Sequence, residues 1–164
     1  MPNWCQNEVS ITAHKGRGEA EGFVNYVLER SEISGDVTNY FSFNKIIPMP
    51  DELRGTTSPT KIVSQEQYDT ARDLDLSITQ EMSDSLKSKY GWDNWYDWAI
   101  RNWGVKWNTD CDTFEIDDFG GLEYKFETAR GPPTRIYIHL VAQFPELDIS
   151  WFYKEEGSRM AGWL

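Results

Sequence analysis

The strongest constraint on the fold is a set of three segments in which apolar and polar residues alternate. In the first, 7–14, Val9 and Ile11 share one side of the pattern. The segments 122–128 and 147–153 show the same period of two. Because successive strand side chains point to opposite faces, each segment predicts a β-strand with one buried face.

Two further segments have the period of a helix. In 20–32, apolar residues recur at three- and four-residue spacings, and a similar stripe follows the proline pair at 132–133. Proline is tolerated in the first turn of a helix, so the pair fits a helix start. A short strand is predicted over 40–44, and Met160–Trp163 adds a hairpin strand after the last long one.

The segment between the second and third strands, about 45–118, is predicted to be helical. Ser64 and Gln67 form a capping-box pair at the start of one long amphipathic helix. A second helix, capped by Asp93, lies in the run 92–107, which holds five of the eight tryptophans. Because this run closes the insertion, its first role is to anchor the insertion. Three of its tryptophans are predicted to point inward: Trp95, Trp98 and Trp103.

This order of elements predicts an α+β fold. It is a ferredoxin-like split βαβ with an antiparallel sheet, a helical insertion between strands 2 and 3, and a C-terminal β-hairpin. A chain of 164 residues suits a single domain, 1–164. The ferredoxin-like core is placed at about 7–44 and 120–164.

Acidic residues outnumber basic ones, 27 against 16, and the formal net charge is −11. Nonspecific binding to nucleic acid comes mainly from Lys and Arg that neutralise phosphates, so this balance opposes it. It favours solubility or a basic partner. Two cysteines are too few for a disulfide framework or a structural zinc site. No signal peptide and no apolar run of about 20 residues is recognisable, so a cytoplasmic protein is expected.

No catalytic, metal-binding or cofactor-binding residue is predicted. The two histidines, His14 and His139, lie far apart, and neither pairs with a cysteine in a recognisable context. Counting from Asp110, the acidic run 110–118 lacks the glycine that an EF-hand loop needs at its sixth position. One alternative stays open, a small nucleotide at the N-terminus of the first helix beside the glycine-rich turn 16–18.

Several phrases along the chain point to a family. They are Asn3-Trp-Cys-Gln-Asn, Phe43-Asn-Lys-Ile-Ile-Pro-Met-Pro, Trp95-Tyr-Asp-Trp, Asn102-Trp-Gly-Val-Lys-Trp, Phe126-Glu-Thr-Ala-Arg-Gly-Pro-Pro, Phe144-Pro-Glu-Leu and Ala161-Gly-Trp. In this order they resemble the YubB-type ferredoxin-like domain family of bacteriophages, plasmids and integrated elements, over nearly the whole chain. The resemblance implies the fold and a mobile-element setting, with no cofactor or general catalytic activity. Arg130-Gly131 departs from the aromatic and small polar pair expected there, so contacts at that corner are expected to differ.

We therefore expect a non-catalytic acidic accessory protein of a phage or mobile element, acting in the host cytoplasm. It would bind a host protein with a basic surface, such as a defence or other nucleic-acid-handling enzyme, and could inhibit host defence. The predicted partner-binding residues are Asp110, Asp112, Glu115, Asp117, Asp118, Trp107 and Arg130. The alternative is a binder of a small nucleotide or single-stranded nucleic acid on the sheet, since such sheets often stack bases on aromatic side chains.

Overall fold

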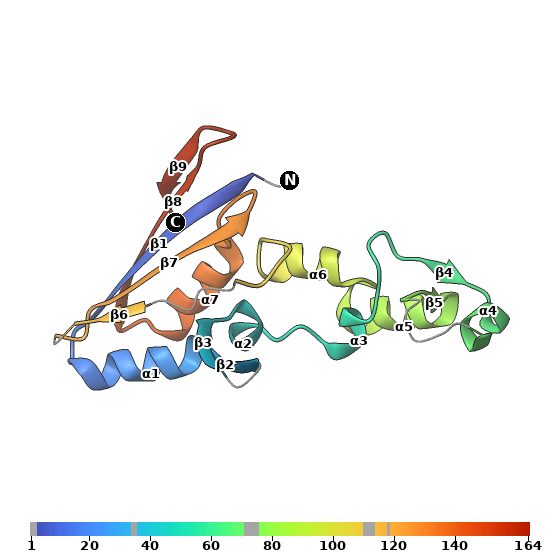
Figure 1. Cartoon of the computed structure of the whole chain (residues 1–164), viewed down its shortest axis with the longest axis horizontal. Coiled ribbons are helices and arrows are strands. Elements are labelled where there is room, and N and C mark those ends of the chain that lie inside the picture. Colours follow the sequence, from blue (N-terminus) through green and yellow to red (C-terminus); the bar gives the residue numbers. More distant parts are fainter. Residues whose placement is uncertain (1–2, 34–35, 71–75, 110–113, 118) are drawn as a thin grey trace. The chain divides into compact units, whose positions relative to one another are not determined.

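Figure 1 shows a computed structural model of the chain in which two compact units are distinguished. The structure describes residues 3–33, 36–70, 76–109, 114–117 and 119–164. Unit 1 consists of 1–48 together with 103–164, and unit 2 consists of 49–102. The sequence placed the insertion at about 45–118 inside one domain, and the folding of the whole chain as a single domain stays a prediction.

Unit 1 is a mixed α+β structure, which confirms the predicted class at that level. Its five-stranded antiparallel sheet has the order β6-β7-β1-β8-β9. The strands are β1 (Trp4–Ala13), β6 (Phe114–Ile116), β7 (Leu122–Ala129), β8 (Leu147–Glu155) and β9 (Met160–Trp163). The helices are α1 (Arg17–Val27), α2 (Phe43–Ile46) and α7 (Thr134–Gln143). A separate two-stranded sheet pairs β2 (Leu28–Ile33) with β3 (Asp36–Phe41).

β1 is the central strand, and its alternation explains how the sheet is buried. Every second side chain from Cys5 to Ala13 is buried, and those between them are exposed. β7 alternates in the same way, from buried Leu122 to buried Thr128. The helices α1 and α7 lie on the buried side of this sheet (Figure 1). The predicted strands at 7–14, 122–128 and 147–153 and the helix after the proline pair are therefore confirmed.

Aromatic rings fill the space between the sheet and its helices. Phe23 of α1, Tyr124 of β7 and Trp151 of β8 are fully buried. The ring centroids of Phe23 and Tyr124 lie 6.3 Å apart, and those of Phe41 and Tyr124 lie 5.0 Å apart. Burying one such side chain contributes roughly 1.5–3 kcal/mol, so these rings supply a large part of the stability of unit 1.

The strand predicted over 40–44 is wrong in extent and in partner. β3 ends at Phe41 and pairs with β2 rather than with the main sheet. Ser42 then caps α2, because its Oγ accepts a hydrogen bond from the N–H of Lys45 at 3.2 Å. The first helix is also shorter than predicted, ending at Val27, because the residues that follow form β2.

The position beside β7 in the main sheet is occupied by β6. In the split βαβ plan the second strand of the core would lie there. The neighbours β7, β1 and β8 follow the order of that plan. The structure therefore shows an antiparallel α+β sheet without showing the split βαβ plan in full.

Unit 2 is built from short elements. They are α3 (Asp51–Arg54), β4 (Ile62–Val63), α4 (Gln65–Thr70), β5 (Ile78–Thr79), α5 (Gln80–Tyr90) and α6 (Trp95–Asn102). The capping box is confirmed, because the N–H of Gln67 donates to Oγ of Ser64 at 3.2 Å and the N–H of Ser64 donates to Oε1 of Gln67 at 3.0 Å. The prediction of one long helix is wrong. The strand β5 lies between α4 and α5 in the chain, and it pairs in parallel with β4.

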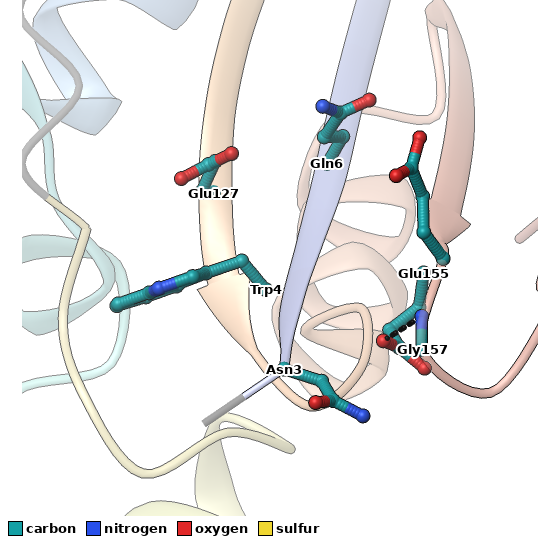
Figure 2. A pocket seen from close by; sticks show the side chains of 7 residues that line it. Asn3, Trp4, Gln6, Glu127, Glu155 and Gly157 are labelled. Carbon is teal, nitrogen blue, oxygen red and sulfur yellow. Dashed lines mark hydrogen bonds between the residues drawn. The ribbon is translucent and has the colours of Figure 1, made fainter. Parts of the chain in front are cut away.

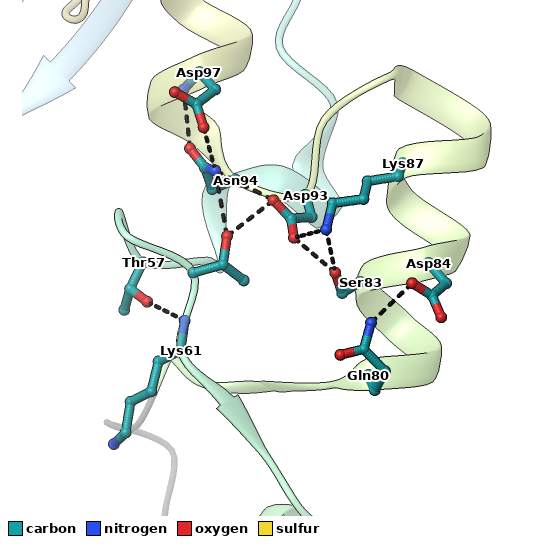
Figure 3. A network of polar contacts seen from close by, with 10 residues as sticks. Thr57, Lys61, Gln80, Ser83, Asp84, Lys87, Asp93, Asn94 and Asp97 are labelled. Carbon is teal, nitrogen blue, oxygen red and sulfur yellow. Dashed lines mark hydrogen bonds and ion pairs between the residues drawn. The ribbon is translucent and has the colours of Figure 1, made fainter.

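Asn94, rather than Asp93, caps α6. Oδ1 of Asn94 accepts a hydrogen bond from the N–H of Asp97 at 2.9 Å. The carboxylate of Asp93 instead accepts from four side chains, those of Thr60, Ser83, Lys87 and Asn94 (Figure 3). Asp93 thus joins the segment before β4 to α5, which is a structural role inside unit 2.

Candidate partner-binding site

Side chains from the segments 3–7 and 126–133 meet in the core of unit 1. Asn7, from the first phrase, is buried, and its Nδ2 donates to Oγ1 of Thr128 at 2.8 Å. The indole N–H of Trp151 donates to Oδ1 of Asn7 at 3.1 Å. The hydroxyl of Thr128 in turn donates to the carbonyl of Gly131 at 2.7 Å. These residues hold the corner after β7, so their role in unit 1 is in packing.

The tryptophan-rich run contains both buried and exposed rings. Trp98 and Trp103 are buried as predicted, whereas Trp95 is half-buried. The indole N–H of Trp103 donates to the carbonyl of Ile47 at 2.9 Å, which anchors the returning chain to unit 1. Trp107 is 42% exposed, so it is available at the surface of unit 1.

The outward-pointing side chains of the main sheet form a surface that we call the open face. It comprises Gln6, Glu8, Ser10, Thr12, Glu123, Lys125, Glu127, Asp148, Ser150, Phe152, Lys154 and Trp163. The strand register arranges them in rows, with Gln6 between Glu127 and Lys154. In the next row, Glu8 lies between Lys125 and Phe152. The open face therefore mixes charged and aromatic groups, with carboxylates on β1, β7 and β8.

A pocket of about 260 Å³ lies at the end of the open face where β1 begins (Figure 2). It is lined by Asn3, Trp4, Gln6, Glu127, Glu155, Glu156 and Gly157. Figure 2 shows Trp4 and Glu127 on one side of β1, and Glu155 and Gly157 on the other. The pocket thus combines one indole, three carboxylates and two side-chain amides.

The indole of Trp4 is part of an exposed aromatic pair. Trp4 is 46% exposed, and its ring centroid lies 6.1 Å from that of Trp107 at an interplanar angle of 36°. Nζ of Lys106 lies 3.6 Å from the ring centroid of Trp107. This is a cation–π contact, so an indole beside the pocket already accepts a cationic side chain of the same chain.

The carboxylates of the β8–β9 turn differ in their partners. Glu155 is buried and accepts hydrogen bonds from the N–H groups of Gly157 at 2.8 Å and Ser158 at 2.6 Å. Hydrogen bonding from Ser158 holds the pKa of Glu155 below its usual value. Lys154, 2.8 Å from Glu156, likewise lowers the pKa of Glu156. Both groups are therefore ionised at neutral pH, and Glu155 serves mainly to hold the turn.

The predicted partner-binding residues fall at different places. Arg130 lies at the pocket end of the sheet, where its N–H donates to the carbonyl of Asn3 at 2.8 Å, and Trp107 contacts Trp4 there. Asp117 lies at the other end, because the neighbouring Leu122 pairs with Ile11. Asp110, Asp112 and Asp118 lie outside the described residues, and Glu115 belongs to β6 rather than to a loop.

Asp117 organises a tight turn between β6 and β7. Its Oδ1 accepts hydrogen bonds from the N–H groups of Phe119 at 2.8 Å and Gly121 at 2.7 Å. Its carboxylate is thus engaged within the chain. The described members of the predicted set do not form one cluster, and their contact with a partner stays a prediction.

The sequence reasoning missed Trp4, Glu127 and Glu156 as site residues. A usable pattern was present, because extending the alternation of β1 backwards places Trp4 on the same face as Gln6. The prediction began the strand at Asn7, a polar residue whose burial is not evident from its type. The hydrogen bonds that bury it come from residues far away in sequence.

The described residues show no arrangement suited to nucleophilic catalysis. Burial raises the pKa of the Cys5 thiol, and Cys5 and His14 lie at opposite ends of β1. In unit 2, Nζ of Lys87 donates to Oγ of Ser83 at 3.1 Å, but Ser83 is fully buried and donates to Asp93 at 2.6 Å (Figure 3). The hydrogen bond with Asp93 raises the pKa of Lys87, which opposes a role as a neutral base.

Metal and anion sites are equally unsupported among the residues that the structure describes. They contain no group of three or more His, Cys, Asp or Glu side chains that could hold a metal ion. At the start of α1, the carboxylate of Glu19 accepts from the N–H of Lys15 at 3.0 Å. The backbone of Gly120 also packs there, since a Cβ on Gly120 would lie 3.1 Å from the carbonyl carbon of Gly16. This place is therefore filled by the chain itself.

The fold and the pocket define a small α+β protein whose main sheet has one face with acidic and aromatic side chains. Comparisons with protein-family models and with curated proteins find no match. Among solved structures, the chain is similar to the crystal structure of the protein api92 from Yersinia pseudotuberculosis, described with the family model DUF1281. The identity is 12% and the TM-score 0.47, over 99% of this chain and 93% of that chain. A similarity of this degree establishes no function.

Within the described part of the chain, no helix has both the length and the apolar character that crossing a membrane requires.

Proposed function

We propose that the chain is a non-catalytic accessory protein that binds a partner protein with a basic surface through the pocket end of its open face. The resemblance of its phrases to the YubB-type ferredoxin-like family supports a phage or mobile-element origin. It also supports a host protein as the partner, met in the host cytoplasm, with a defence or nucleic-acid-handling enzyme as the candidate class. On this proposal unit 1 is a ferredoxin-like split βαβ in which β6 occupies the place of the second strand.

The observation that carries the proposal is the composition of the pocket. Trp4 contributes a half-exposed indole, and Glu127 and Glu156 contribute carboxylates beside it. Tryptophan is favoured at the centre of protein interfaces, where it buries a large area. Carboxylates around such a centre speed encounter with a basic partner and reject acidic ones.

Charge reversal at the pocket tests this proposal. The bait proteins are the wild type, Glu127→Lys, and the control Glu146→Lys, which makes the same charge change at an exposed position outside the open face. Host proteins captured from lysate are identified by mass spectrometry. We expect the wild type and the control to recover one basic partner in a fixed ratio, and Glu127→Lys to recover at least about ten-fold less, a loss of about 1.4 kcal/mol.

Two results contradict the proposal. One is a partner recovered equally by all three baits, because the pocket would then play no part. The other is the absence of any captured protein together with a small molecule that remains bound to the chain in native mass spectrometry.

A second candidate function is binding of single-stranded nucleic acid or a nucleotide on the open face. It is favoured by Phe152 and Trp163, whose ring centroids lie 5.2 Å apart, because bases stack on such rings. The carboxylates of Glu8 and Glu123 oppose it, since they repel phosphates. Salt-dependent binding of labelled single strands in fluorescence anisotropy, lost in Trp163→Ala, would favour this function over the first.

A further inference from the structure

We propose that the pocket binds the guanidinium group of an arginine side chain, which stacks on Trp4 and pairs with the carboxylate of Glu127. This inference rests on the proposed function, because it names the chemical group of the basic partner that enters the pocket.

The size of the pocket suits one long side chain. Its volume of about 260 Å³ lies just below the roughly 300–1,000 Å³ that is typical of small-molecule sites. It opens on the face of a sheet and is lined from β1, β7 and the β8–β9 turn. A side chain entering from a partner would therefore meet three segments of unit 1 at once.

Among the three carboxylates of the pocket, Glu127 is the one placed to meet a cation over Trp4. Both oxygens of Glu155 accept backbone N–H groups of the turn, and Glu156 is paired with Lys154 at 2.8 Å. Glu127 is exposed on β7 and lies on the same side of β1 as Trp4 (Figure 2). An ion that stacks on this indole therefore has a carboxylate on the same side of the strand.

The indole of Trp4 is held in place before any partner arrives. It packs against Trp107 at a centroid distance of 6.1 Å, and β1 fixes its backbone by pairing Trp4 with Ala129. Lys106 is positioned over Trp107 at 3.6 Å. Because Trp4 already packs against Trp107, less side-chain entropy is lost when a ligand stacks on it.

The choice of arginine over lysine follows from the shape of the lining. A guanidinium is planar, stacks on an aromatic face, and presents donors in a fork that matches a carboxylate. Its weaker hydration lowers the cost of leaving water in a half-open pocket. Asn3 and Gln6 add side-chain carbonyls that can accept its remaining N–H groups. A lysine ammonium would gain the charge pairing without the stacking.

Two peptides distinguish these possibilities with the full-length protein. One alternates glycine and arginine, and the other alternates glycine and lysine, so that their charge and length are equal. Binding is measured by isothermal titration calorimetry at low salt. We expect the arginine peptide to bind about five-fold more tightly, which corresponds to about 1 kcal/mol gained by planar stacking of the guanidinium on the indole beyond the cation–π contact that lysine also makes.

Two variants and a matched control locate the contact. Trp4→Leu is expected to remove the preference for arginine, and Glu127→Gln is expected to weaken binding of both peptides. Trp92→Leu, at an exposed tryptophan of unit 2, should leave both affinities unchanged. Circular dichroism confirms that each variant is folded, and the shift of the Trp4 indole N–H resonance on titration reports binding at the pocket independently.

The outcomes separate the two proposals. Equal affinity for both peptides, with both weakened by Glu127→Gln, overturns the arginine assignment and leaves the binding of a basic protein intact. Failure of both peptides to bind at low salt overturns the arginine assignment, and the capture experiment with Glu127→Lys then decides the proposed function separately. A preference for arginine that persists in Trp4→Leu overturns stacking on that indole.

Discussion

Replacing Asn7 with alanine is expected to destabilise unit 1 by about 3 kcal/mol. Nδ2 of Asn7 donates to the carbonyl of Cys5 at 2.9 Å and to Oγ1 of Thr128 at 2.8 Å, and Oδ1 accepts from the indole of Trp151. Each of these bonds contributes about 1 kcal/mol net, and a buried donor left without an acceptor costs about 1–3 kcal/mol. The total of about 3 kcal/mol is the loss of the two hydrogen bonds that Asn7 donates, together with the cost of leaving the indole N–H of Trp151 without an acceptor.

A double-mutant cycle with Trp151→Phe isolates the bond between the two side chains. Stability is measured by urea-dependent hydrogen exchange of the amides of β1 and β8, which reports on unit 1 rather than unit 2. The coupling between Asn7→Ala and Trp151→Phe is expected to be about 1–2 kcal/mol. Ser10→Ala, at an exposed position of the same strand, serves as the control and should change stability by less than about 0.5 kcal/mol.

A decrease of less than about 1 kcal/mol in the free energy of unfolding for Asn7→Ala would refute the reasoning, since removing a buried amide with these hydrogen-bond partners should destabilise unit 1 by more than that. A coupling near zero would equally refute it, because Asn7 and Trp151 would then contribute independently.

Two further predictions concern Asp93 and the glycines. Burial alone would raise the pKa of Asp93, but hydrogen bonds led by that from Lys87 outweigh burial and hold its pKa at about 2, below the ordinary 3.8. The ionised carboxylate of Asp93 therefore stabilises unit 2 by about 2 kcal/mol above about pH 5, and this contribution is lost as the pH falls from about 4 to 2. Acid unfolding of unit 2 should show this pH dependence. The variant Asp93→Asn should abolish it. Gly104→Ala should lower the melting temperature, because Gly104 has φ +89° and a Cβ would lie 3.1 Å from the backbone N of Thr134. Gly22→Ala, in open space within α1, should raise the free energy of unfolding by about 0.5–1 kcal/mol. Calorimetry that shows melting-temperature shifts of the same sign for Gly104→Ala and Gly22→Ala would contradict these two predictions.

The parts of the fold that were predictable are those in which a single face is buried. Apolar and polar residues alternate along β1, β7 and β8 because one side of the sheet packs on α1 and α7 while the other side meets water. Successive residues therefore differ in polarity, and this pattern can be recognised in the sequence. The helix after Pro133 was recognised for a similar reason, since its apolar stripe and its proline boundary agree.

Other parts depend on contacts that no local pattern contains. Glu29 lies in a helical pattern yet belongs to β2, because pairing with β3 decides its conformation. Ile78 fits the helical spacing of its neighbours, but its N–H donates to the carbonyl of Lys61 at 3.0 Å, in a strand pair. Tertiary pairing overrides local propensity in both cases.

Only the chemical character of the candidate site could be predicted from the sequence. Acidity and exposed tryptophan were foreseen, and Trp107 and Arg130 do lie at the pocket end. The pocket itself needs β1, β7 and the β8–β9 turn side by side, which depends on strand order. No sequence pattern separates Glu127 and Glu156 from the other acidic residues of a chain that has 27 of them.

The hydrogen bond from the Trp103 indole to the Ile47 carbonyl joins the two places where the chain leaves and re-enters unit 1. The two ends of the inserted segment 49–102 therefore join unit 1 at neighbouring points. Segments of very different lengths can be exchanged between two such points without changing the strand order of the sheet, because the entropy cost of closing a loop grows only slowly with its length. The same junction suits replacement of unit 2 by a short linker, or the grafting of a different module onto an unchanged unit 1.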